Sequence, residues 1–266
     1  MNRLLQTLSL HLWAGDFSLH FVMFRVTWAS VNMTTLPQKT MKLNKQEIIT
    51  NFFRAYRQYD KKQCLVYLKK ARLFCQIDPT FHDWVYCFEG IFAFVFEDWV
   101  KAEQIFKKLQ QHDLEPYLHA VVMFNLGRVL DARGHWKDAT DTFQQCATDF
   151  EQLGHPLDQA RALRHIGITY QKGFDKGDFD VSKLRIAIKF CDTALEIIEL
   201  VPHYDNDKRL IWLKGSVWNT LGIIYKDLDE FETSLEYFNK CLLGYTEIED
   251  KNSVAYILGN MGEVYL

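Results

Sequence analysis

Three aspartates, Asp175, Asp178 and Asp180, lie close enough in the sequence to suggest a calcium-binding loop. Loops of the EF-hand type space their oxygen ligands as D-x-D-x-D-G, and that spacing is absent here. The surrounding stretch, QKGFDKGDFD, contains two glycines but no G-K-[ST] sequence, so it lacks the pattern of a phosphate-binding loop. This segment therefore predicts a solvated turn rather than an ion or nucleotide site.

The histidines and serines give no stronger indication of catalysis. The nine histidines include no H-E-x-x-H pattern, and His112 and His119 lie near an expected loop. Ser182 and Ser216 have no His and Asp pattern that would identify a nucleophile. We therefore expect no enzyme activity, no cofactor and no metal site, and we rank a cryptic catalytic site as the third hypothesis.

The six cysteines include no C-x-x-C pair, which argues against a paired-cysteine metal site. We expect Cys64, Cys146, Cys191 and Cys241 to pack in the core as small apolar residues rather than to be reactive. Free thiols in a long helical chain also indicate a reducing compartment, and we expect a cytoplasmic protein.

Bulk properties exclude two classes of partner. The 266 residues carry a net charge of −3, whereas a general nucleic-acid binder is strongly basic. Residues 1–44 are apolar in part, but they hold no clean run of 18 apolar residues, so we expect no membrane span. We interpret this segment as an ill-ordered or loosely packed leader. A short helix on the first repeat and an interfacial anchor are the alternatives.

Prolines and glycines indicate where helices begin and where they pack. Pro79, Pro116, Pro156 and Pro202 separate long stretches with a 3.6-residue apolar period, and each interval has room for two helices and a turn. A glycine falls inside a predicted helix of each interval, although glycine costs about 1 kcal/mol there relative to alanine. The close approach of a second helix would explain why glycine is found at these positions. These glycines are Gly90, Gly127, Gly167, Gly222 and Gly262.

A small residue and a ring follow several of these glycines at fixed distances. Ser234 lies twelve residues after Gly222, and Phe238 lies four residues further on. We expect these residues to be the contacts between two paired helices. The same spacing gives Ala102 and Phe106 after Gly90, and Ala139 and Phe143 after Gly127.

This pattern resembles the tetratricopeptide repeat, whose signature is W-x2-L-G-x2-Y followed by A-x3-F. The resemblance covers residues 45–266 and implies an all-α, right-handed superhelical solenoid of about five and a half antiparallel helical hairpins. Repeats are expected near 45–78, 83–116, 120–153, 160–202 and 215–248, with a half repeat at 255–266. The glycine spacing near 40 residues resembles the long-helix subgroup of signalling scaffolds. The best match consists of Trp218, Leu221, Gly222, Tyr225, Phe231, Ser234, Phe238 and Cys241.

The fourth repeat departs from the pattern, because GFDKGDFD delays its second helix by about eight residues. Ala187, Cys191 and Ala194 then take the later places. The last half repeat places Leu258, Met261 and Tyr265 on an apolar face, which we expect to be exposed unless another chain or a further segment covers it.

The resemblance also implies a peptide-binding groove lined by the first helix of each hairpin. Arginine forks in it would suit the carboxylates of an acidic peptide. A merely solvated charged face is the alternative. The predicted groove residues are Phe124, Arg128, Arg161, Arg164, Ile168, Lys172, Asn219, Ile223 and Lys226.

Some members of the family bind a C-terminal carboxylate with a clamp of Lys, Asn and Arg residues. Asn125 and Arg161 stand at two of the clamp positions. At three other clamp positions this sequence has His165, Cys87 and Ile91 instead of the clamp residues. The clamp is incomplete, so binding of a chaperone tail is not expected.

The sequence therefore predicts a non-catalytic protein-interaction scaffold or adaptor that binds a peptide segment of a protein partner. The alternative is a regulatory or sensor arm of a larger effector, such as a protease, kinase or transcription regulator, truncated near residue 266. Self-association or a missing domain at the C-terminal half repeat is a further possibility under either hypothesis.

Overall fold

The computed structural model describes residues 44–202 and 207–266, so the predicted leader lies almost wholly outside the described residues. The chain divides into two compact units between Ile77 and Asp78. The described part of the first unit is one helical hairpin, α2 (Lys45–Arg57) and α3 (Lys61–Phe74). Phe52 and Ala71 are fully buried in it.

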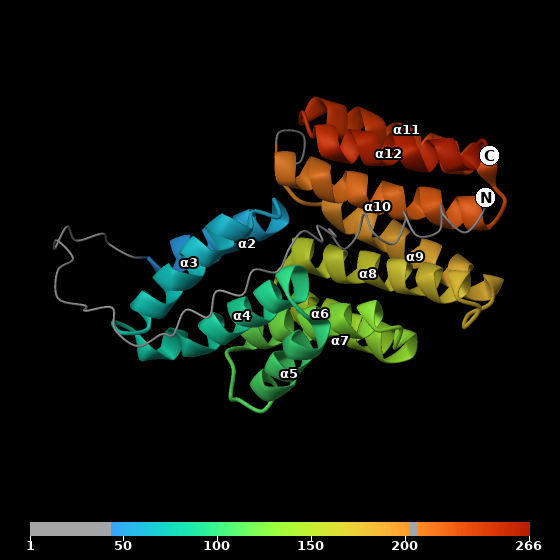
Figure 1. Cartoon of the computed structure of the whole chain (residues 1–266). Helices are drawn as coiled ribbons and strands as arrows, with labels where there is room; N and C mark the ends of the chain where they lie inside the picture. Colours follow the sequence, from blue (N-terminus) through green and yellow to red (C-terminus); the bar gives the residue numbers. More distant parts are fainter. Residues whose placement is uncertain (1–43, 203–206) are drawn as a thin grey trace, which may run out of the picture. The chain divides into compact units, whose positions relative to one another are not determined.

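The second unit is a series of helices in which each packs on the next (Figure 1). The described residues form eleven α-helices in the two units and no strand, so the all-α fold of five and a half hairpins is confirmed. The helices of the second unit are α4 (His82–Phe96), α5 (Trp99–Leu109), α6 (Pro116–Ala132), α7 (Trp136–Gln152), α8 (Pro156–Asp175), α9 (Val181–Glu199), α10 (Lys208–Asp227), α11 (Phe231–Glu247) and α12 (Lys251–Val264).

Prolines and aspartates start these helices. Pro116 and Pro156 occupy the first positions of α6 and α8, where a missing backbone N–H costs nothing. The Asp180 carboxylate accepts a hydrogen bond from the backbone N–H of Ser182 at 2.8 Å and caps α9. Asp98, Asp207 and Asp250 cap α5, α10 and α12 in the same way.

The helices end in a repeated way. A residue with positive φ lies two positions after the end of each of several helices, and Gly134 and Gly154 take this place after α6 and α7. A left-handed residue lets the chain turn back while the last helical carbonyls keep hydrogen-bond partners. Asp229 and Glu249 adopt the same conformation after α10 and α11, although neither is a glycine.

Rings seated on glycines join the paired helices, as the sequence predicts. A Cβ atom at Gly127 would lie 2.8 Å from the Phe143 ring, and one at Gly222 would lie 2.6 Å from the Phe238 ring. Phe143 and Phe238 are fully buried. The small residue has its own role, because Ser234 Oγ donates a 2.7 Å hydrogen bond to the carbonyl of Gly222.

The fourth hairpin, α8 and α9, confirms the expected eight-residue delay. The Cys191 sulfur takes the place of the ring, 2.7 Å from where a Cβ atom at Gly167 would be. Cys191, Ala187 and Ala194 are all fully buried. The insertion lengthens α8 and adds a short connection before Val181.

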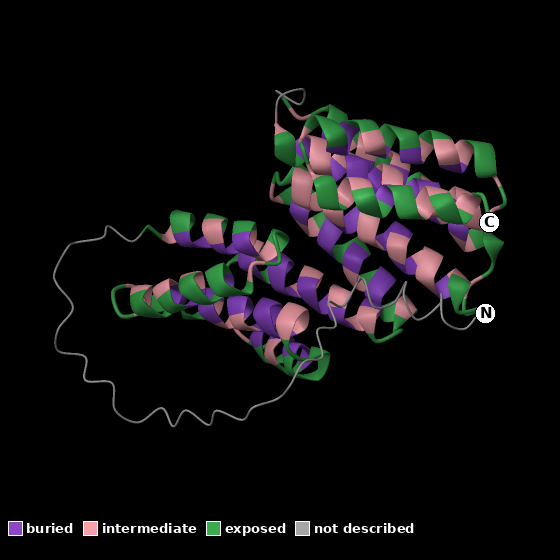
Figure 2. Cartoon of the chain, turned by 45° about the horizontal axis from the view of Figure 1, so that its top comes forward, coloured by how far each residue is buried: buried purple, intermediate pink, exposed green. Residues whose placement is uncertain are grey.

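The first helices of the hairpins in the second unit form one row, which we call the first-helix row: α4, α6, α8, α10 and α12. Each contacts the next member of the row, in addition to its own hairpin partner. No comparable contact joins successive second helices within the described residues of this unit. The first helices are therefore the inner layer. Buried residues line the helix surfaces that face each other, and exposed residues line the outer surfaces (Figure 2).

Burial differs between the aromatic-rich α4 and the last helix, α12. Trp84, Phe88 and Phe92 of the aromatic-rich α4 are buried rather than displayed on the surface. On α12, Leu258 is 53% exposed and Tyr265 is 73% exposed, as expected. Met261 differs, because it packs partly against the buried cluster that contains Phe238 and Ile257.

The ring-on-glycine contact predicts opposite effects at two glycines in the same register. We expect Gly222→Leu to lower the free energy of unfolding by at least about 2 kcal/mol, because the buried Phe238 ring fills the space that the new side chain needs. Gly262→Leu should be neutral or stabilising by about 0.5–1 kcal/mol, because no atom of the described residues outside its own stretch of helix lies within 4 Å of its Cβ position and leucine favours helix.

Thermal unfolding followed by circular dichroism would measure both variants. Equal destabilisation of the two variants would contradict the assignment of the ring contact as the feature that joins the hairpins.

Candidate functional site: the first-helix row

All nine predicted groove residues lie on the first-helix row and are half-buried. Phe124 and Arg128 come from α6, whereas Asn219, Ile223 and Lys226 come from α10. The remaining four come from α8: Arg161, Arg164, Ile168 and Lys172. The structure therefore places the set on three neighbouring helices. That these residues bind a peptide stays a prediction.

Basic side chains of α6 and α8 form a cluster, which we call the arginine cluster: Arg128, Arg161, Arg164 and His165. The Arg128 guanidinium lies 4.5 Å from the centroid of the Phe94 ring and donates to Asn125 at 3.2 Å. Arg161 donates to Asp158 at 2.6 Å. Mutual repulsion of the guanidiniums favours an anion beside them.

Two polar atoms of the arginine cluster are buried without a hydrogen-bond partner among the described residues: Nε of Arg164 and Nδ1 of His165. The His165 ring stacks on Phe143, with centroids 5.1 Å apart and planes at 29°. Burial, reinforced by the Arg164 charge, holds the pKa of His165 well below its ordinary value. His165 is therefore neutral near pH 7, and an unpartnered buried donor such as Arg164 Nε is costly unless an acceptor reaches it.

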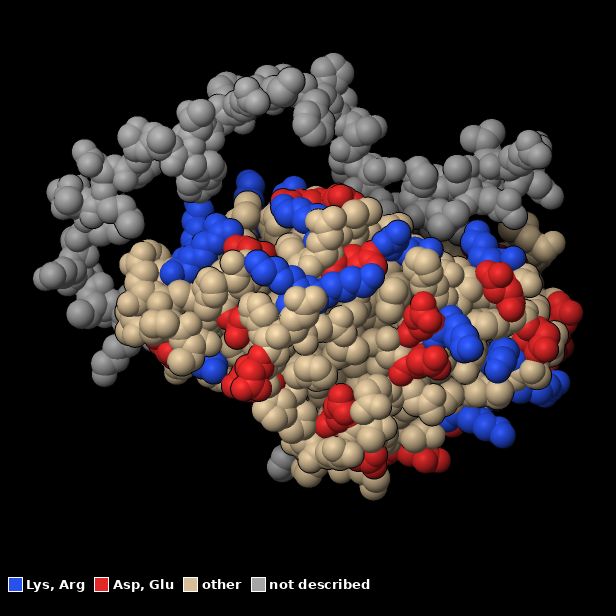
Figure 3. Space-filling model, turned by 90° about the horizontal axis from the view of Figure 1, so that it is seen from below, with Lys and Arg blue, Asp and Glu red and all other residues tan. Residues whose placement is uncertain are grey.

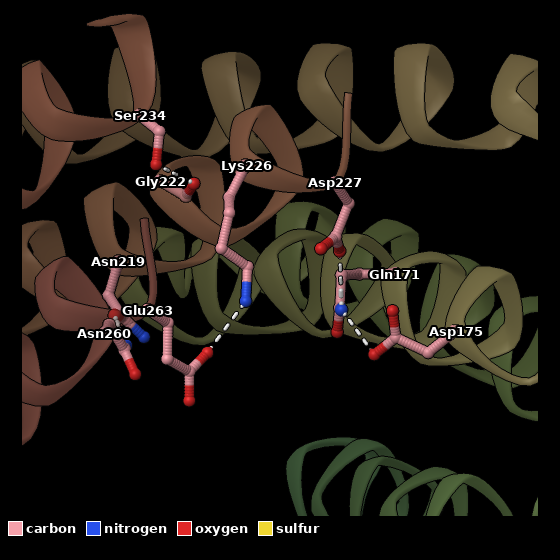
Figure 4. Close-up of polar contacts among 9 residues, drawn as sticks. All are labelled: Gln171, Asp175, Asn219, Gly222, Lys226, Asp227, Ser234, Asn260 and Glu263. Atoms are coloured by element: carbon pink, nitrogen blue, oxygen red, sulfur yellow. Dashed lines mark hydrogen bonds and ion pairs between the residues drawn. The ribbon is translucent and has the colours of Figure 1, made fainter. Parts of the chain in front are cut away.

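The other cations of the predicted set already have carboxylate partners. Lys172 Nζ lies 2.5 Å from the buried Asp131 carboxylate, which also accepts from Thr169 at 2.9 Å. Lys226 donates to Glu263 of α12 at 2.8 Å (Figure 4). These two lysines therefore stabilise the packing of neighbouring first helices, which the sequence analysis did not predict.

Sequence reasoning also missed a carboxylate pair at the C-terminal ends of α8 and α10. The Gln171 amide donates to Asp175 at 2.7 Å and to Asp227 at 2.8 Å, so one NH2 group bridges both helices (Figure 4). Burial and the nearby Asp175 charge raise the pKa of Asp227 to about 6. Helical spacing could have indicated Gln171, because it lies one turn after Ile168 on the same face.

The residues first considered for chemistry have structural roles. Asp178 accepts a hydrogen bond from the indole of Trp136 at 2.7 Å, while Asp180 caps α9. Within the described residues, no group of His, Cys, Asp and Glu side chains could hold a metal ion. All six cysteines are free thiols, and burial raises the pKa of Cys64 to about 11 and that of Cys146 to about 12. Such thiols are protonated near pH 7 and poorly reactive.

Acidic and basic side chains are interspersed with uncharged surface on the face drawn in Figure 3. Of the absent clamp positions, Cys87 and Ile91 are buried and offer no polar group. None of the helices in residues 44–202 and 207–266 is long and apolar enough to cross a membrane.

The Asp227 site predicts a pH-dependent change in stability. The folded pKa is raised, so the folded state loses stability as pH rises from about 4 through 6. Asp227→Asn should remove this loss while it keeps an oxygen acceptor for Gln171. We expect the variant to gain about 1–2 kcal/mol over the wild type at pH 7.5 relative to pH 4.

Denaturant unfolding at both pH values would measure this difference, with the exposed Asp141→Asn as the matched control. A wild-type pH dependence that persists unchanged in Asp227→Asn would refute the assignment. The nearby titratable and charged groups are Asp175, Lys226 and Glu263.

No protein-family model matches the chain, and no curated protein sequence matches it significantly. Solved structures do match. BtubC (BKLC) from P. vanneervenii is 15% identical, with a TM-score of 0.56 over 82% of this chain and 83% of that chain. A kinesin light chain protein from Podosopora anserina with nearly identical TPR-like repeats is 8% identical, with a TM-score of 0.51 over 77% of this chain and 96% of that chain.

These similarities concern the fold, and assignment to the long-helix subgroup stays a prediction. The helices, their order and the ring-on-glycine contacts agree with the sequence signature, and the similarity to known repeat structures agrees with both. The chain therefore has the tetratricopeptide-like repeat fold.

Proposed function

We propose that this protein is a non-catalytic interaction scaffold whose first-helix row binds an acidic peptide segment of a protein partner. The inner position of the first helices supports the proposal, because side chains of α6, α8 and α10 can act on one ligand. Half-buried apolar side chains beside the charges, such as Phe124, Ile168 and Ile223, would contribute contact area.

One observation carries the acidic character of the ligand: the buried Nε of Arg164 has no hydrogen-bond partner among the described residues. Arg161 and Arg128 lie near enough to lower the pKa of Arg164 further, after the larger effect of burial. A carboxylate would satisfy the free donor and offset this repulsion. Guanidinium groups bind carboxylates through two parallel hydrogen bonds, which makes an Asp or Glu side chain a suitable ligand.

The paired lysines refine the site. Because Lys172 and Lys226 are neutralised by Asp131 and Glu263, they would add little attraction for an anion. We therefore assign the anion-binding role to Arg164 of the arginine cluster, because Arg161 already pairs with Asp158, and we assign the two lysines to helix packing. The regulatory arm of a larger effector and the cytoplasmic location stay hypotheses.

Selection of peptides from a random display library on the immobilised full chain would test this proposal. We expect enriched peptides to share Asp or Glu, and Arg164→Gln to weaken their binding about tenfold or more, because a charged hydrogen bond to the ligand is lost. Raising the salt concentration should weaken binding as well.

Lys137→Gln is the matched control, because it removes one positive charge from an exposed site on α7. The control should bind like the wild type. Peptides without acidic residues, or equal binding by Arg164→Gln and the wild type, would show that the arginine cluster is not the ligand site.

A further inference from the structure

Positive charge is concentrated in the first helical hairpin. Residues 45–77, which contain α2 and α3, carry eight lysines and arginines against two acidic residues. Residues 78–266 carry 19 lysines and arginines against 31 acidic residues, so the second unit is strongly acidic. Charge asymmetry of this size within one chain favours an anionic partner for the basic part.

The outward surface of α3 combines this charge with aliphatic side chains. Three buried residues mark the inward side of the helix: Cys64, Leu68 and Ala71. The opposite side is exposed, and we call these four residues of it the α3 face: Lys62, Val66, Lys69 and Leu73. Steps of four, three and four residues keep their side chains in one stripe. Val66 is 42% exposed and Leu73 is 41% exposed.

The register of the repeat shows that neighbouring hairpins leave such a stripe open. On α7, Ala139, Phe143 and Cys146 are buried in the register of the three inward residues of α3. Helix α7 packs against both α6 and α8, yet its counterparts of the α3 face are exposed. These counterparts are Lys137, Asp141, Gln144 and Thr148. Stacking of hairpins therefore does not cover positions of this kind.

The α3 face differs in its chemistry from the same stripe on later helices. The stripe includes Asp141 on α7, Glu196 on α9 and Glu236 on α11, and all three are exposed. The four residues of the α3 face include no acidic side chain, and a valine and a leucine alternate with its lysines. The face thus offers positive charge and aliphatic contact area together.

We propose that the α3 face is a contact surface for an anionic lipid membrane. The ammonium groups of Lys62 and Lys69 meet the phosphate and carboxylate groups of lipid headgroups, and Val66 and Leu73 enter the boundary between headgroups and acyl chains. Lysine stems are long enough to keep the charge at headgroup level while the aliphatic neighbours lie deeper. The proposal does not depend on peptide binding at the arginine cluster.

The aliphatic side chains favour a lipid surface over a nucleic acid. Nucleic acids are bound by cations, by hydrogen-bonding groups and by rings that stack on bases, and Val66 and Leu73 are none of these. Residues 1–43 carry four lysines and arginines against one acidic residue, so charge does not attract them to this face. Because the whole chain has a net charge of −3, attraction to an anionic membrane must come from a local basic surface.

Co-sedimentation of the full chain with lipid vesicles tests the proposal. Vesicles of phosphatidylcholine and phosphatidylserine in equal amounts are compared with vesicles of phosphatidylcholine alone. We expect saturable binding to the anionic vesicles, binding at least about tenfold weaker to the neutral ones, and a loss of binding as salt is raised. Equal binding to both vesicles, or binding to neither, would overturn the proposal.

Charge reversal locates the contact on the chain. Lys62→Glu combined with Lys69→Glu should weaken binding to the anionic vesicles at least about tenfold, because each cation near the surface contributes to the attraction. Lys137→Glu combined with Lys189→Glu is the matched control, since it makes the same charge change at exposed positions of the same stripe on α7 and α9. The control should bind like the wild type. Equal weakening by both pairs would assign binding to net charge and overturn the α3 face.

The aliphatic residues distinguish a membrane from other polyanions. Val66→Gln combined with Leu73→Gln keeps the charge and should weaken vesicle binding at least about fivefold, because less apolar surface leaves water. Unchanged vesicle binding would contradict membrane contact. A DNA duplex that binds the wild type as tightly as the vesicles, at equal phosphate concentration, would assign the face to nucleic acid. All substituted side chains are exposed, and circular dichroism checks that each variant is folded.

Discussion

Close approach between paired helices is the constraint on which the rest of this structure depends. Each glycine destabilises its helix by about 1 kcal/mol relative to alanine. Burial of an entire aromatic ring against the helix backbone offsets this loss. Phe106, Phe143 and Phe238 each occupy such a place and are fully buried. Because each of these ring-on-glycine contacts lies inside one hairpin, the hairpin is the unit that the sequence must specify, and the row of first helices follows from stacking these units.

Much of the fold could be predicted from the sequence for the same reason. The ring contact needs particular residues at fixed separations, so it leaves a pattern that can be read without coordinates, even through the eight-residue insertion before Cys191. Helix starts could also be predicted from the sequence, since Pro116 and Pro156 stand at the first positions of their helices. The left-handed ends at Asp229 and Glu249 were not, because a non-glycine residue there gives no distinctive signal.

The candidate site was only partly predictable. Periodicity assigned nine residues to the first helices of their hairpins, and they do lie on α6, α8 and α10, but that they line a binding groove stays a prediction. It could not separate Arg164, whose Nε is buried without a partner among the described residues, from Lys172, which pairs with Asp131. That pairing joins residues 41 positions apart and depends on how neighbouring hairpins are rotated. The bridge from Gln171 to Asp227 is longer still, at 56 positions.

Contacts limited to adjacent hairpins have a consequence for how the second unit opens. Each helix relies on its immediate neighbours, so loss of one hairpin removes support from the next without directly exposing the distant ones. Local opening is then graded along the chain, with the amides of α12 exchanging with solvent sooner than those of α8, which is packed on both sides. The local stability of a helix in such an array therefore depends on its place in the row of hairpins as much as on its own residues.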